Sequence, residues 1–594
     1  MFSFRLCALN LTDGTVITPP RDGMTIFTGP NNSGKSVLLR ELVTSVHVPA
    51  SPDPKRWLKS VQMHREGGGE EFIEWLAERG IEGKNHPRNN IRYLPDRHPS
   101  EEYYTLSVDA ASTYWQNGKL GEVGHFLVND QWTESRLANQ TDAPQWEWVR
   151  PASHPTQILW ESREKMRQFS DLFERAFGVP IVINRYAPNI RLQFGPVGVE
   201  DTAPPPSSEL MEAYASLPYV NEQGDGVRAF TNLLVHTLIR PAPVIVIDEP
   251  EAFLHPPQVR LLAHYLIRYT PAPCQIFVAT HSADFLSGAL EENAATPGNP
   301  TRGLCLVRIS RNTGFPVARS LPSESVNEIL DTPLLRYSNI VAGIFHDGVV
   351  LCEGEGDCQF YAATFDAVRG SSPHENLIFL HVNGKARLSD AAWKLRACGV
   401  PVAAIADFDF LNDTKKIKDA LSHLGGDWEA VKADVFLIQK EASSEVTATT
   451  ASEIKKQIIS IIGNPRGKTA LTDRQVESIT EALKTANGWK KMKASGLESL
   501  NGESYAAAKR LISYFAELGL FLVPVGELEC WVKDIPRSNK MVWLNRVFEE
   551  GRHRSPSGEL QEFSVGVKEY LTSRGRHLGD AKESRTAEMS DTSI

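Results

Sequence analysis

The sequence has few cysteines, and none of them forms a CxxC pair. The seven cysteines are scattered at positions 7, 274, 305, 352, 358, 398 and 530. An odd number without regular spacing argues against a disulfide scaffold and against a zinc module. We therefore expect the chain to work in a reducing environment, the cytoplasm.

Long apolar runs and an excess of positive charge are also absent. No apolar stretch approaches the roughly 20 residues that span a bilayer, and the amino terminus has no signal-peptide pattern. We therefore expect a soluble protein with no membrane partner. The formal net charge of −10 argues against coating of nucleic acid through overall charge, but it leaves room for local basic patches.

The chain is too long for one hydrophobic core, since it has 594 residues. Short, fully apolar segments typical of parallel strands alternate with helical patterns, which predicts an α/β fold. We expect a first α/β domain over 1–340 and a second over 341–535, followed by a mostly helical C-terminal region over 536–594. Roughly the last 25 residues are polar and aperiodic, and are predicted to be disordered.

Two segments inside these domains are predicted to be helical insertions. The tryptophan-rich segment 50–165 has few clear strand patterns, and we interpret it as a largely helical dimerisation or substrate element. The second insertion covers 440–515. In the second domain, "GVVLCEG", "LIFLHVNG", "VPVAAIADFD" and "DVFLIQ" are predicted strands.

A nucleotide motif occurs near the amino terminus. "GPNNSGKS" matches G-x-x-x-x-G-K-[ST] and lies between a predicted strand and a predicted helix. Gly29, Asn32 and Gly34 belong to a loop whose backbone N–H groups can surround phosphates at a helix amino terminus. Lys35 would reach the outer phosphates, and the Ser36 hydroxyl would bind Mg²⁺.

The other half of a nucleotide site follows two later apolar strands. "VIVIDEP" places Asp248 where it can bind the metal and Glu249 where it can act as base for the attacking water. "VATHS" places His281 at the next strand end, where it could sense the γ-phosphate. A histidine there is more often a structural residue, but these motifs together predict a site for ATP and Mg²⁺.

Carboxylates cluster at two strand ends of the second domain. "VVLCEGEGDCQFY" carries Glu353, Glu355 and Asp357, whose mutual repulsion is costly unless a cation lies among them. "VAAIADFDFLND" ends in Asp407 and Asp409, and residues two apart on a strand share one face.

The carboxyl ends of parallel strands form one edge of a sheet, so these acids are expected to converge there on Mg²⁺ or Mn²⁺. "VGELECW" adds Glu527 and Glu529, and we choose Glu529 for a second metal. The alternatives are solvated strand ends, a surface pair of acids at 527 and 529, and a helix cap at Asp357.

The nucleotide motifs resemble those of ABC-type ATPase heads in SMC-like and recombination proteins. In that family a D-loop follows the Asp-Glu pair, and "PEAFLHP" matches it loosely. The resemblance offers "EQGDGVRAF" as a signature motif that caps the ATP of a partner head, through Gly224, Asp225, Gly226 and Arg228. It departs from the usual Ser-Gly-Gly form, and the alternative is an ordinary loop before a helix. A signature would imply a homodimer; the Q-loop glutamine cannot be assigned.

The acidic pattern resembles the TOPRIM domain of topoisomerases, some primases and a group of nucleases. Glu353, Asp407 and Asp409 match its motif, and Asp357 matches an acid common in the nuclease branch. The resemblance implies a Mg²⁺ or Mn²⁺ site that activates water and stabilises charge on a phosphodiester. A lysine near the cleaved phosphate would help, and Lys533, Lys540 and Lys568 are candidates.

An ABC-type ATPase followed by a TOPRIM unit looks like the OLD (overcoming lysogenization defect) family of nucleases. Gabija-type antiphage nucleases and some retron-associated effectors share this layout. The resemblance implies a DNA endonuclease or nickase under nucleotide control, in antiphage defence, acting as a homodimer or larger assembly. A helicase, or a reverse transcriptase with its RNA/DNA element, would be a possible partner.

Two basic clusters could lead a phosphate backbone to the acids. They are "KKIKD" at 415–419 and "WKKMK" at 489–493, although lysine pairs are more often solvated helix faces. The competing hypothesis is an ATP-driven DNA-binding or signalling clamp whose TOPRIM unit is not catalytic. No segment favours a topoisomerase or a primase. The DNA preference, the trigger and the direction of ATP control stay open.

Overall fold

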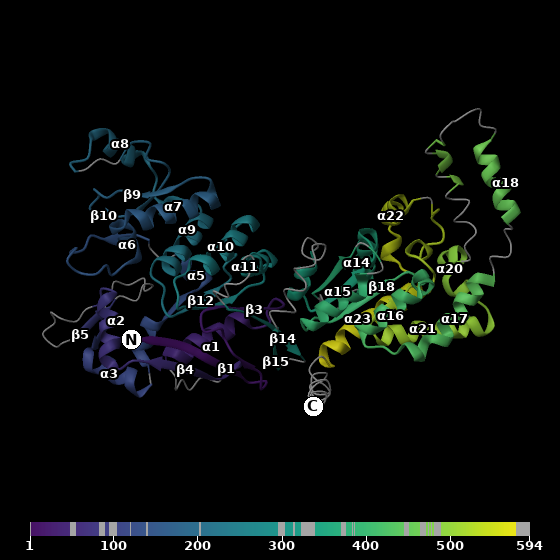
Figure 1. The fold of residues 1–594 in the computed structure, drawn as a ribbon, viewed down its shortest axis with the longest axis horizontal. Coiled ribbons are helices and arrows are strands. Elements are labelled where there is room, and N and C mark those ends of the chain that lie inside the picture. Colours follow the sequence, from purple (N-terminus) through teal and green to yellow (C-terminus); the bar gives the residue numbers. More distant parts are fainter. Residues whose placement is uncertain are drawn as a thin grey trace. The chain divides into compact units, whose positions relative to one another are not determined.

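The computed structural model divides the chain into two compact units, Met1–Leu330 (unit 1) and Asp331–Ile594 (unit 2). Each unit is an α/β body (Figure 1). The residues that the structure describes are 2–47, 55–81, 90–93, 104–118, 120–137, 141–200, 204–294, 303–312, 315–321, 339–369, 376–382, 384, 387–444, 451–463, 471–472, 474–476, 478–479, 489–537 and 539–577.

A six-stranded sheet forms the centre of unit 1, in the order β15-β14-β3-β13-β12-β7. All neighbours are parallel except the β14–β15 pair, which is antiparallel. The middle strands are fully buried apolar segments, as expected for a parallel sheet covered on both faces. The strands are β3 (Gly23–Thr28), β7 (Val128–Gln131), β12 (Val244–Asp248), β13 (Gln275–Ala279), β14 (Gly303–Asn312) and β15 (Phe315–Leu321).

A second, antiparallel sheet has the order β2-β1-β4 and packs against the first through helix α1. Its strands are β1 (Ser3–Leu11), β2 (Val16–Ile17) and β4 (Leu58–Glu66). Helix α1 (Lys35–His47) contacts β4 on one side and β12 and β13 on the other (Figure 1). Its buried residues Leu38, Leu39 and Leu42 therefore belong to a core shared by the two sheets.

The segment 50–165, predicted to be a largely helical insertion, is helical only in part: its described residues form several helices between Gly69 and Glu161, but also strands that join both sheets of unit 1. Strand β4 pairs with β1 along its length, and β7 is an edge strand of the central sheet. Trp57 packs in the core, and a Cβ atom on Gly34 would lie 2.4 Å from its Nε1. The residues of strand β4 after Leu58 are exposed or half-buried without clean alternation, so the pairing that creates the strand is invisible in the local sequence.

The other described elements of unit 1 surround these sheets (Figure 1). The helices are α2 (Gly69–Glu78), α3 (Val108–Asn117), η1 (Gly121–Val123), α4 (Gly124–Leu127), α5 (Thr133–Arg136), α6 (Pro155–Glu161), α7 (Arg163–Phe177), α8 (Ser208–Ser216), η2 (Val220–Glu222), α9 (Asp225–Leu234), the π-helical η3 (Val235–Ile239), α10 (Pro256–Tyr269) and α11 (Ala283–Ala294). The short strands are β5 (Asn90–Tyr93), β6 (Tyr104–Ser107), β8 (Ala143–Pro144), β9 (Ile181–Ile183), β10 (Asn189–Ile190) and β11 (Leu192–Phe194).

Unit 2 is built on a four-stranded, all-parallel sheet in the order β17-β16-β18-β19. The strands are β16 (Gly348–Cys352), β17 (Leu377–His381), β18 (Val402–Ala406) and β19 (Leu520–Leu522). Val350, Cys352, Ala403 and Ile405 pack in one cluster with residues of α14, α22 and α23. The alternate residues of β16 and β18 are buried as well, so the sheet is covered on both faces.

Helices account for most of the rest of unit 2. They are η4 (Asn339–Phe345), α14 (Glu355–Arg369), α15 (Leu388–Ala397), η6 (Phe408–Asn412), α16 (Thr414–Leu424), α17 (Trp428–Ser444), α18 (Ala451–Ile462), α20 (Trp489–Ser495), η8 (Gly496–Ser499), α21 (Gly502–Glu517), η9 (Leu528–Cys530), α22 (Lys540–Glu549), η10 (Arg552–Arg554) and α23 (Gly558–His577). Between β18 and β19 the described residues thus form helices, including α17, α18 and α21 (Figure 1).

Two local predictions in unit 2 need correction. "DVFLIQ" lies inside α17 and is not a strand: Val431, Val435 and Ile438 are buried at helical spacing, while Phe436 is 48% exposed. The predicted disorder near the C-terminus begins too early, because α23 continues to His577. The last residues, 578–594, lie outside the described part of the chain.

No helix in the described ranges is long and apolar enough to cross a membrane.

Candidate functional site

The predicted phosphate loop connects β3 to α1. Gly29 has φ +136°, and a Cβ atom there would lie 2.0 Å from the backbone oxygen of Ile309, so only glycine fits. Asn32 has φ 60°, a left-handed conformation that asparagine tolerates better than most residues. Gly34, at φ +105°, completes the loop. The strand, loop and helix are in the order that a phosphate-binding loop requires.

Lys35 lies over its own loop. Its Nζ donates to the backbone oxygens of Gly29 and Pro30, at 2.9 Å each, and it is 7% exposed. Burial lowers the pKa of Lys35, although the nearby carboxylates Glu251, Glu249 and Asp248 oppose that shift. The ammonium group is thus held at the loop, where phosphate oxygens could replace the carbonyl oxygens as acceptors.

The predicted metal-binding pair of the nucleotide site is in direct contact. Ser36 Oγ donates to Asp248 Oδ1 at 2.9 Å, although the two residues are far apart in the sequence. Asp248 is the last residue of β12 and Ser36 follows β3, and β13 separates these two strands. Burial raises the pKa of Asp248, and the Ser36 hydrogen bond acts against that shift. A hydroxyl and a carboxylate at this spacing fit Mg²⁺ bound with ATP.

Glu249 follows directly in a constrained turn. Its φ of 49° is left-handed, which costs a non-glycine residue about 1–3 kcal/mol. Its N–H donates to the Ala279 backbone oxygen at 2.8 Å. His281 Nδ1 lies 3.6 Å from Glu249 Oε1, so the predicted base and the predicted sensor are neighbours.

A third acid of this site, Glu251, was not recognised from the sequence. Its carboxylate accepts hydrogen bonds from Thr280 Oγ1 and from the His281 backbone N–H, at 2.9 Å each. His281 Nδ1 lies 3.4 Å from Glu251 Oε1. The signal was present, since Glu251 follows the Asp-Glu pair by only two positions.

The candidate signature residues lie at the start of α9. Gly224 is the residue before the helix, and Asp225 accepts from Arg228 at 3.1 Å. A Cβ atom on Gly226 would lie 2.6 Å from the backbone oxygen of Phe253, within the segment matched loosely to a D-loop. The structure therefore brings the two candidate motifs together. Their role toward a partner's ATP stays a prediction.

Among the described residues, Gln131 is a candidate by position for the Q-loop glutamine that the sequence did not assign. Gln131 is the last residue of β7 and lies in register beside Ile247, one residue before Asp248. It is fully buried, and its Nε2 donates to Asn129 Oδ1 at 2.9 Å.

In unit 2 the predicted acidic residues lie at one edge of the parallel sheet. Glu353 follows β16, and Asp407 follows the neighbouring strand β18. The Asp407 N–H donates to Glu353 Oε1 at 3.2 Å. The next N–H, of Phe408, donates to the Gly526 backbone oxygen at 2.8 Å, which brings the segment after β19 to the same place. We call this region the acidic edge.

The expected geometry of Asp407 and Asp409 is wrong. Strand β18 ends at Ala406, and Asp409 lies in the 3₁₀ helix η6. Because a 3₁₀ helix has three residues per turn, side chains two positions apart point to different sides. The two carboxylates therefore do not share a strand face, although both are half-buried near the same strand end.

Asp357 is both a turn cap and an ion-pair partner. It lies in the first turn of α14, and its Oδ2 accepts from the Gly354 N–H at 2.9 Å. Its Oδ1 accepts from Lys540 Nζ at 2.6 Å. Among the three candidate lysines, Lys540 is thus the one seen at the acidic edge. Lys533 pairs with the exposed Glu498, and Lys568 lies on α23.

Lys493 is a second lysine at the acidic edge, and the sequence indicated it only as part of a basic cluster. Its Nζ lies 3.3 Å from Glu527 Oε2. Burial lowers the pKa of Lys493, but Asp407, Asp409 and Glu527 raise it more, so the pKa lies above its ordinary value. The packing is tight: a Cβ atom on Gly526, which has φ +113°, would lie 2.1 Å from the Lys493 backbone oxygen. The turn after β19 therefore fixes α20 against the acids.

Glu529, predicted to bind a second metal, lies in the 3₁₀ helix η9 and is half-buried. Burial raises its pKa, and Glu527 and Asp357 add to that rise, whereas Lys540 lowers it. Lys540 interacts with Asp357, Asp407 and Glu529 together, and these acids raise its pKa against the effect of burial. Glu529 thus belongs to the same electrostatic group as Asp357 and Asp407.

The donor chemistry suits Mg²⁺ or Mn²⁺, because carboxylate oxygens are the hard ligands these ions prefer. Among the residues that the structure describes, however, no three His, Cys, Asp or Glu side chains stand close enough to hold a metal ion. Lys493 and Lys540 supply positive charge to the acids instead. The carboxylates of the acidic edge are thus the residue types that bind a divalent ion, but in this structure lysines neutralise part of their negative charge.

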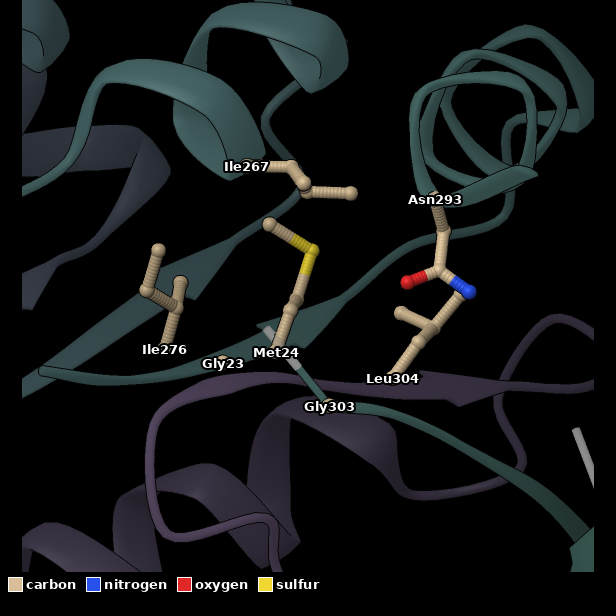
Figure 2. A pocket seen from close by; sticks show the side chains of 7 residues that line it. All are labelled: Gly23, Met24, Ile267, Ile276, Asn293, Gly303 and Leu304. Carbon is tan, nitrogen blue, oxygen red and sulfur yellow. The ribbon is translucent and has the colours of Figure 1, made fainter. Parts of the chain in front are cut away.

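A small pocket of unit 1 lies away from the phosphate loop (Figure 2). Gly23, Met24, Ile276, Gly303 and Leu304 line it from the amino ends of β3, β13 and β14. The phosphate loop is at the opposite, carboxyl end of β3. No charged side chain lines this pocket, and all of its lining side chains except that of Asn293 are apolar or absent, so it offers no phosphate or metal ligands.

Two family models match separate parts of the chain. Residues 141–287 match "AAA domain, putative AbiEii toxin, Type IV TA system", and this range contains Asp248, Glu249 and His281. Residues 344–409 match "Overcoming lysogenization defect protein-like, TOPRIM domain", and this range contains Glu353, Asp357, Asp407 and Asp409. The predicted order of an ATPase domain followed by an OLD-like TOPRIM domain is thus confirmed.

One curated relative supports the same resemblance. The Old nuclease of Escherichia phage P2 is 26% identical over 276 residues, which cover 44% of this chain and 43% of that protein. The match therefore spans less than half the length of the relative.

Solved structures also resemble the chain. The Smc head domain of Pyrococcus furiosus, bound to the C-terminal domain of ScpA, has a TM-score of 0.32 and 12% identity, covering 56% of this chain and 99% of that one. The cbiO1 subunit of the Clostridium perfringens ABC transporter complex has a TM-score of 0.26 and 13% identity, covering 57% and 95%. The α/β fold itself is established by the central sheets of the two units, in which every strand pair except β14–β15 is parallel.

Proposed function

We propose that this chain, an ATPase domain followed by an OLD-like TOPRIM domain, is a Mg²⁺- or Mn²⁺-dependent DNA endonuclease or nickase controlled by ATP. The observation that carries the proposal is the convergence of three parallel strand ends at the acidic edge. The hydrogen bond from Asp407 to Glu353 joins two of them, and the bond from Phe408 to Gly526 joins the third.

In the proposed mechanism unit 1 binds and hydrolyses ATP. The loop 29–34 would surround the phosphates, and Lys35 would turn from its loop carbonyls to the outer phosphates. Ser36 and Asp248 would hold the Mg²⁺ that accompanies ATP. Glu249 would orient and deprotonate the attacking water, with His281 beside it near the γ-phosphate.

The acidic edge of unit 2 would carry out cleavage. Glu353, Asp357, Asp407 and Asp409 would supply oxygen ligands, and Glu529 would serve a second ion. A divalent metal there supplies a nucleophilic water and stabilises the charge that develops on a phosphodiester. Lys540 and Lys493 would keep phosphate oxygens at the site, because each presents an ammonium group at the same edge.

We also propose the assembly and setting in which the enzyme acts. A homodimer would let residues 224–226 of one copy complete the ATP site of another, and the contact of Gly226 with Phe253 is compatible with such a surface. The scattered cysteines suit the cytoplasm. An antiphage role, with a helicase or a reverse transcriptase and its RNA/DNA element as partner, follows from family resemblance alone.

Plasmid cleavage tests the proposal. Supercoiled plasmid is incubated with the purified full chain in Mg²⁺ or Mn²⁺, with and without ATP, beside the Asp407→Ala variant. We expect nicked or linear DNA from the wild type and none from the variant. Asp366→Ala is the matched control, because Asp366 is an exposed acid on α14 that pairs with Arg369.

Two results would count against cleavage at this edge. If Asp407→Ala cuts as fast as the wild type, the acidic edge is not the nuclease site. If the wild type binds plasmid and hydrolyses ATP but cuts nothing in either metal, the clamp hypothesis replaces the nuclease. The lysine-balanced arrangement of the acids favours that alternative more than any other feature of unit 2.

A further inference from the structure

Arg136 is a charged side chain with no exposed surface, and no motif predicted a role for it. It ends helix α5, which follows the edge strand β7. Its Nη2 donates to the backbone oxygens of Asp248 and Glu249, at 2.8 and 2.7 Å, and to Thr133 Oγ1 at 2.9 Å. The guanidinium therefore binds the backbone of Asp248 and Glu249, the predicted metal ligand and the predicted base.

The other two guanidinium nitrogens do not contact the turn through hydrogen bonds. Nε and Nη1 of Arg136 are buried and make no hydrogen bond to the described residues. Burial lowers the pKa of Arg136 to about 10, and Glu251, Asp248 and Glu249 oppose that shift. The group thus stays charged at neutral pH. Burial of a charged side chain costs free energy that its hydrogen bonds must offset. The side-chain hydrogen bonds of Arg136 go to the Asp248–Glu249 turn and to Thr133 of its own helix.

The turn does need support, because Glu249 has a left-handed backbone. At φ 49° the residue is held on one side by its N–H bond to Ala279 and on the other by the bond from Arg136 to its carbonyl oxygen. Such conformations persist only where the surroundings over-determine them. The direction of the Glu249 carboxylate follows from that backbone.

The segment that carries Arg136 also contacts the candidate signature helix. Asn232 Nδ2, on α9, donates to the Arg136 backbone oxygen at 2.6 Å. Arg228 Nη2, near the start of α9, donates to the Leu137 backbone oxygen at 2.7 Å. Helix α9 is thus hydrogen-bonded to the backbone of residues 136–137, and the Arg136 side chain is hydrogen-bonded to the turn at Glu249.

We propose that Arg136 is a positioning residue for ATP hydrolysis, whose guanidinium keeps the Asp248–Glu249 turn, and with it the Glu249 carboxylate, in the geometry that orients the attacking water. Arg136 also links α9 to this turn, because Asn232 of α9 bonds to its backbone and its side chain bonds to the turn. The inference rests on the ATP-hydrolysing part of the proposed function and is independent of DNA cleavage.

Steady-state ATP hydrolysis and nucleotide binding by the full chain test this role. Wild type is compared with Arg136→Met, which keeps an unbranched stem but removes the guanidinium, and with Arg136→Lys, which keeps the charge. We expect Arg136→Met to lower kcat about tenfold or more, while KM and the Kd for ATP change less than about threefold. Arg136→Lys should recover part of kcat, because an ammonium can still donate to the two carbonyl oxygens.

Arg240→Met is the matched control for a purely structural role. Arg240 Nη1 likewise donates to two backbone oxygens, of Arg79 and Ala152, but away from the ATP site. We expect it to lower the melting temperature and leave kcat unchanged. A kcat for Arg136→Met within about threefold of wild type, or a Kd for ATP that rises in parallel with the fall in kcat, would overturn the inference.

A second variant covers the case in which Arg136→Met does not fold. Asn232→Ala leaves the Arg136 side chain in place and removes the hydrogen bond from α9 to its backbone. We expect a smaller fall in kcat, about threefold, with an unchanged Kd for ATP; an unchanged kcat would contradict the role of α9. If wild type itself hydrolyses no ATP, the proposed ATPase fails and the inference with it, whereas equal hydrolysis by wild type and variants overturns the inference alone.

Discussion

The nucleotide site of unit 1 and the acidic edge of unit 2 both lie at the carboxyl ends of parallel strands, but their charges are arranged differently. In unit 1, Asp248 already bonds to Ser36, and Lys35 rests on its own loop. In unit 2, Asp357 and Glu527 pair with lysines from other helices. A compact loop motif builds the phosphate-binding half of the first site, whereas the charged residues of the second all come from distant segments.

The two sites should therefore differ in their sensitivity to substitutions in distant helices. The residues 29–36 are positioned by one strand, one loop and one helix, so their geometry is largely local. The acidic edge depends on the packing of α20 and α22 against strand ends, because those helices carry Lys493 and Lys540. We therefore expect the edge to respond to changes in distant helices and to divalent ions more than the loop does.

The largest expected effect separates two neighbouring acids. Glu353→Gln should lower plasmid cleavage about 100- to 1,000-fold, because the amide is a poorer metal ligand and Asp407 loses a charged acceptor. Glu355→Gln should cut at the wild-type rate, because Glu355 is exposed and accepts a long hydrogen bond from Gln359 Nε2 on its own helix. Nicking time courses compare the two variants; equal losses would refute the assignment of Glu353.

The next effect concerns unit 1. Asp248→Asn should lower ATP hydrolysis about 100-fold, because the metal loses a charged ligand while the side chain keeps its shape and its contact with Ser36. Cleavage chemistry at the acidic edge should survive and change only in its response to ATP. Phosphate release and nicking are measured on the same preparation. Hydrolysis at the wild-type rate would remove Asp248 from the site.

A smaller effect sharpens the account of the lysines. Lys493→Met should lower cleavage roughly tenfold, as loss of an outer partner of a metal site does. It should also make the chain less stable without metal and more strongly stabilised by Mn²⁺, because the ion must then offset the repulsion among Asp407, Asp409 and Glu527 that Lys493 no longer relieves. Thermal unfolding with and without Mn²⁺ measures this.

Lys491→Met is the control for that prediction. Lys491 lies on the same helix, two positions away. An equal Mn²⁺ response in the two variants would show that Lys493 has no special place at the acidic edge.

The smallest expected effect is on stability as a function of pH. Burial raises the pKa of Glu529 above its ordinary value of 4.5, so the folded chain holds a proton there that the unfolded chain has lost. Stability contributed by Glu529 is therefore present at low pH and lost as pH rises through that raised pKa. Glu529→Gln should make the fall above pH 4.5 shallower.

Denaturant unfolding across this pH range measures the effect. Glu498→Gln serves as the control, because Glu498 is an exposed partner of Lys533. A slope that is the same for Glu529→Gln and wild type would contradict the electrostatic description of the edge.

Much of both sites could be predicted because the decisive signals are local. A buried strand, a glycine loop and Lys35 are consecutive, and Asp248 and Asp407 each end an apolar strand whose parallel pairing follows from its composition. The convergence of Glu353 with Asp407 then needs only adjacency of two strands, which the structure shows.

The rest depends on contacts between distant residues. Lys493 reaches the acids because Gly526 lets its backbone approach, and no spacing in the sequence reveals that. Arg136 reaches Asp248 because β7 joins the central sheet beside β12, although a helical insertion was predicted there. The shared face expected of Asp407 and Asp409 is not formed because the strand ends at Ala406, before both residues.

We propose that one chain holds two catalytic sites, an ATPase site in unit 1 and a metal-dependent nuclease site in unit 2. The most direct test measures plasmid cleavage and ATP hydrolysis together for wild type, Asp407→Ala and Asp248→Asn in Mn²⁺. We expect Asp407→Ala to hydrolyse ATP but cut no DNA, and Asp248→Asn to cut DNA but to hydrolyse ATP about 100-fold more slowly than wild type. Cleavage by Asp407→Ala at the wild-type rate would contradict this proposal.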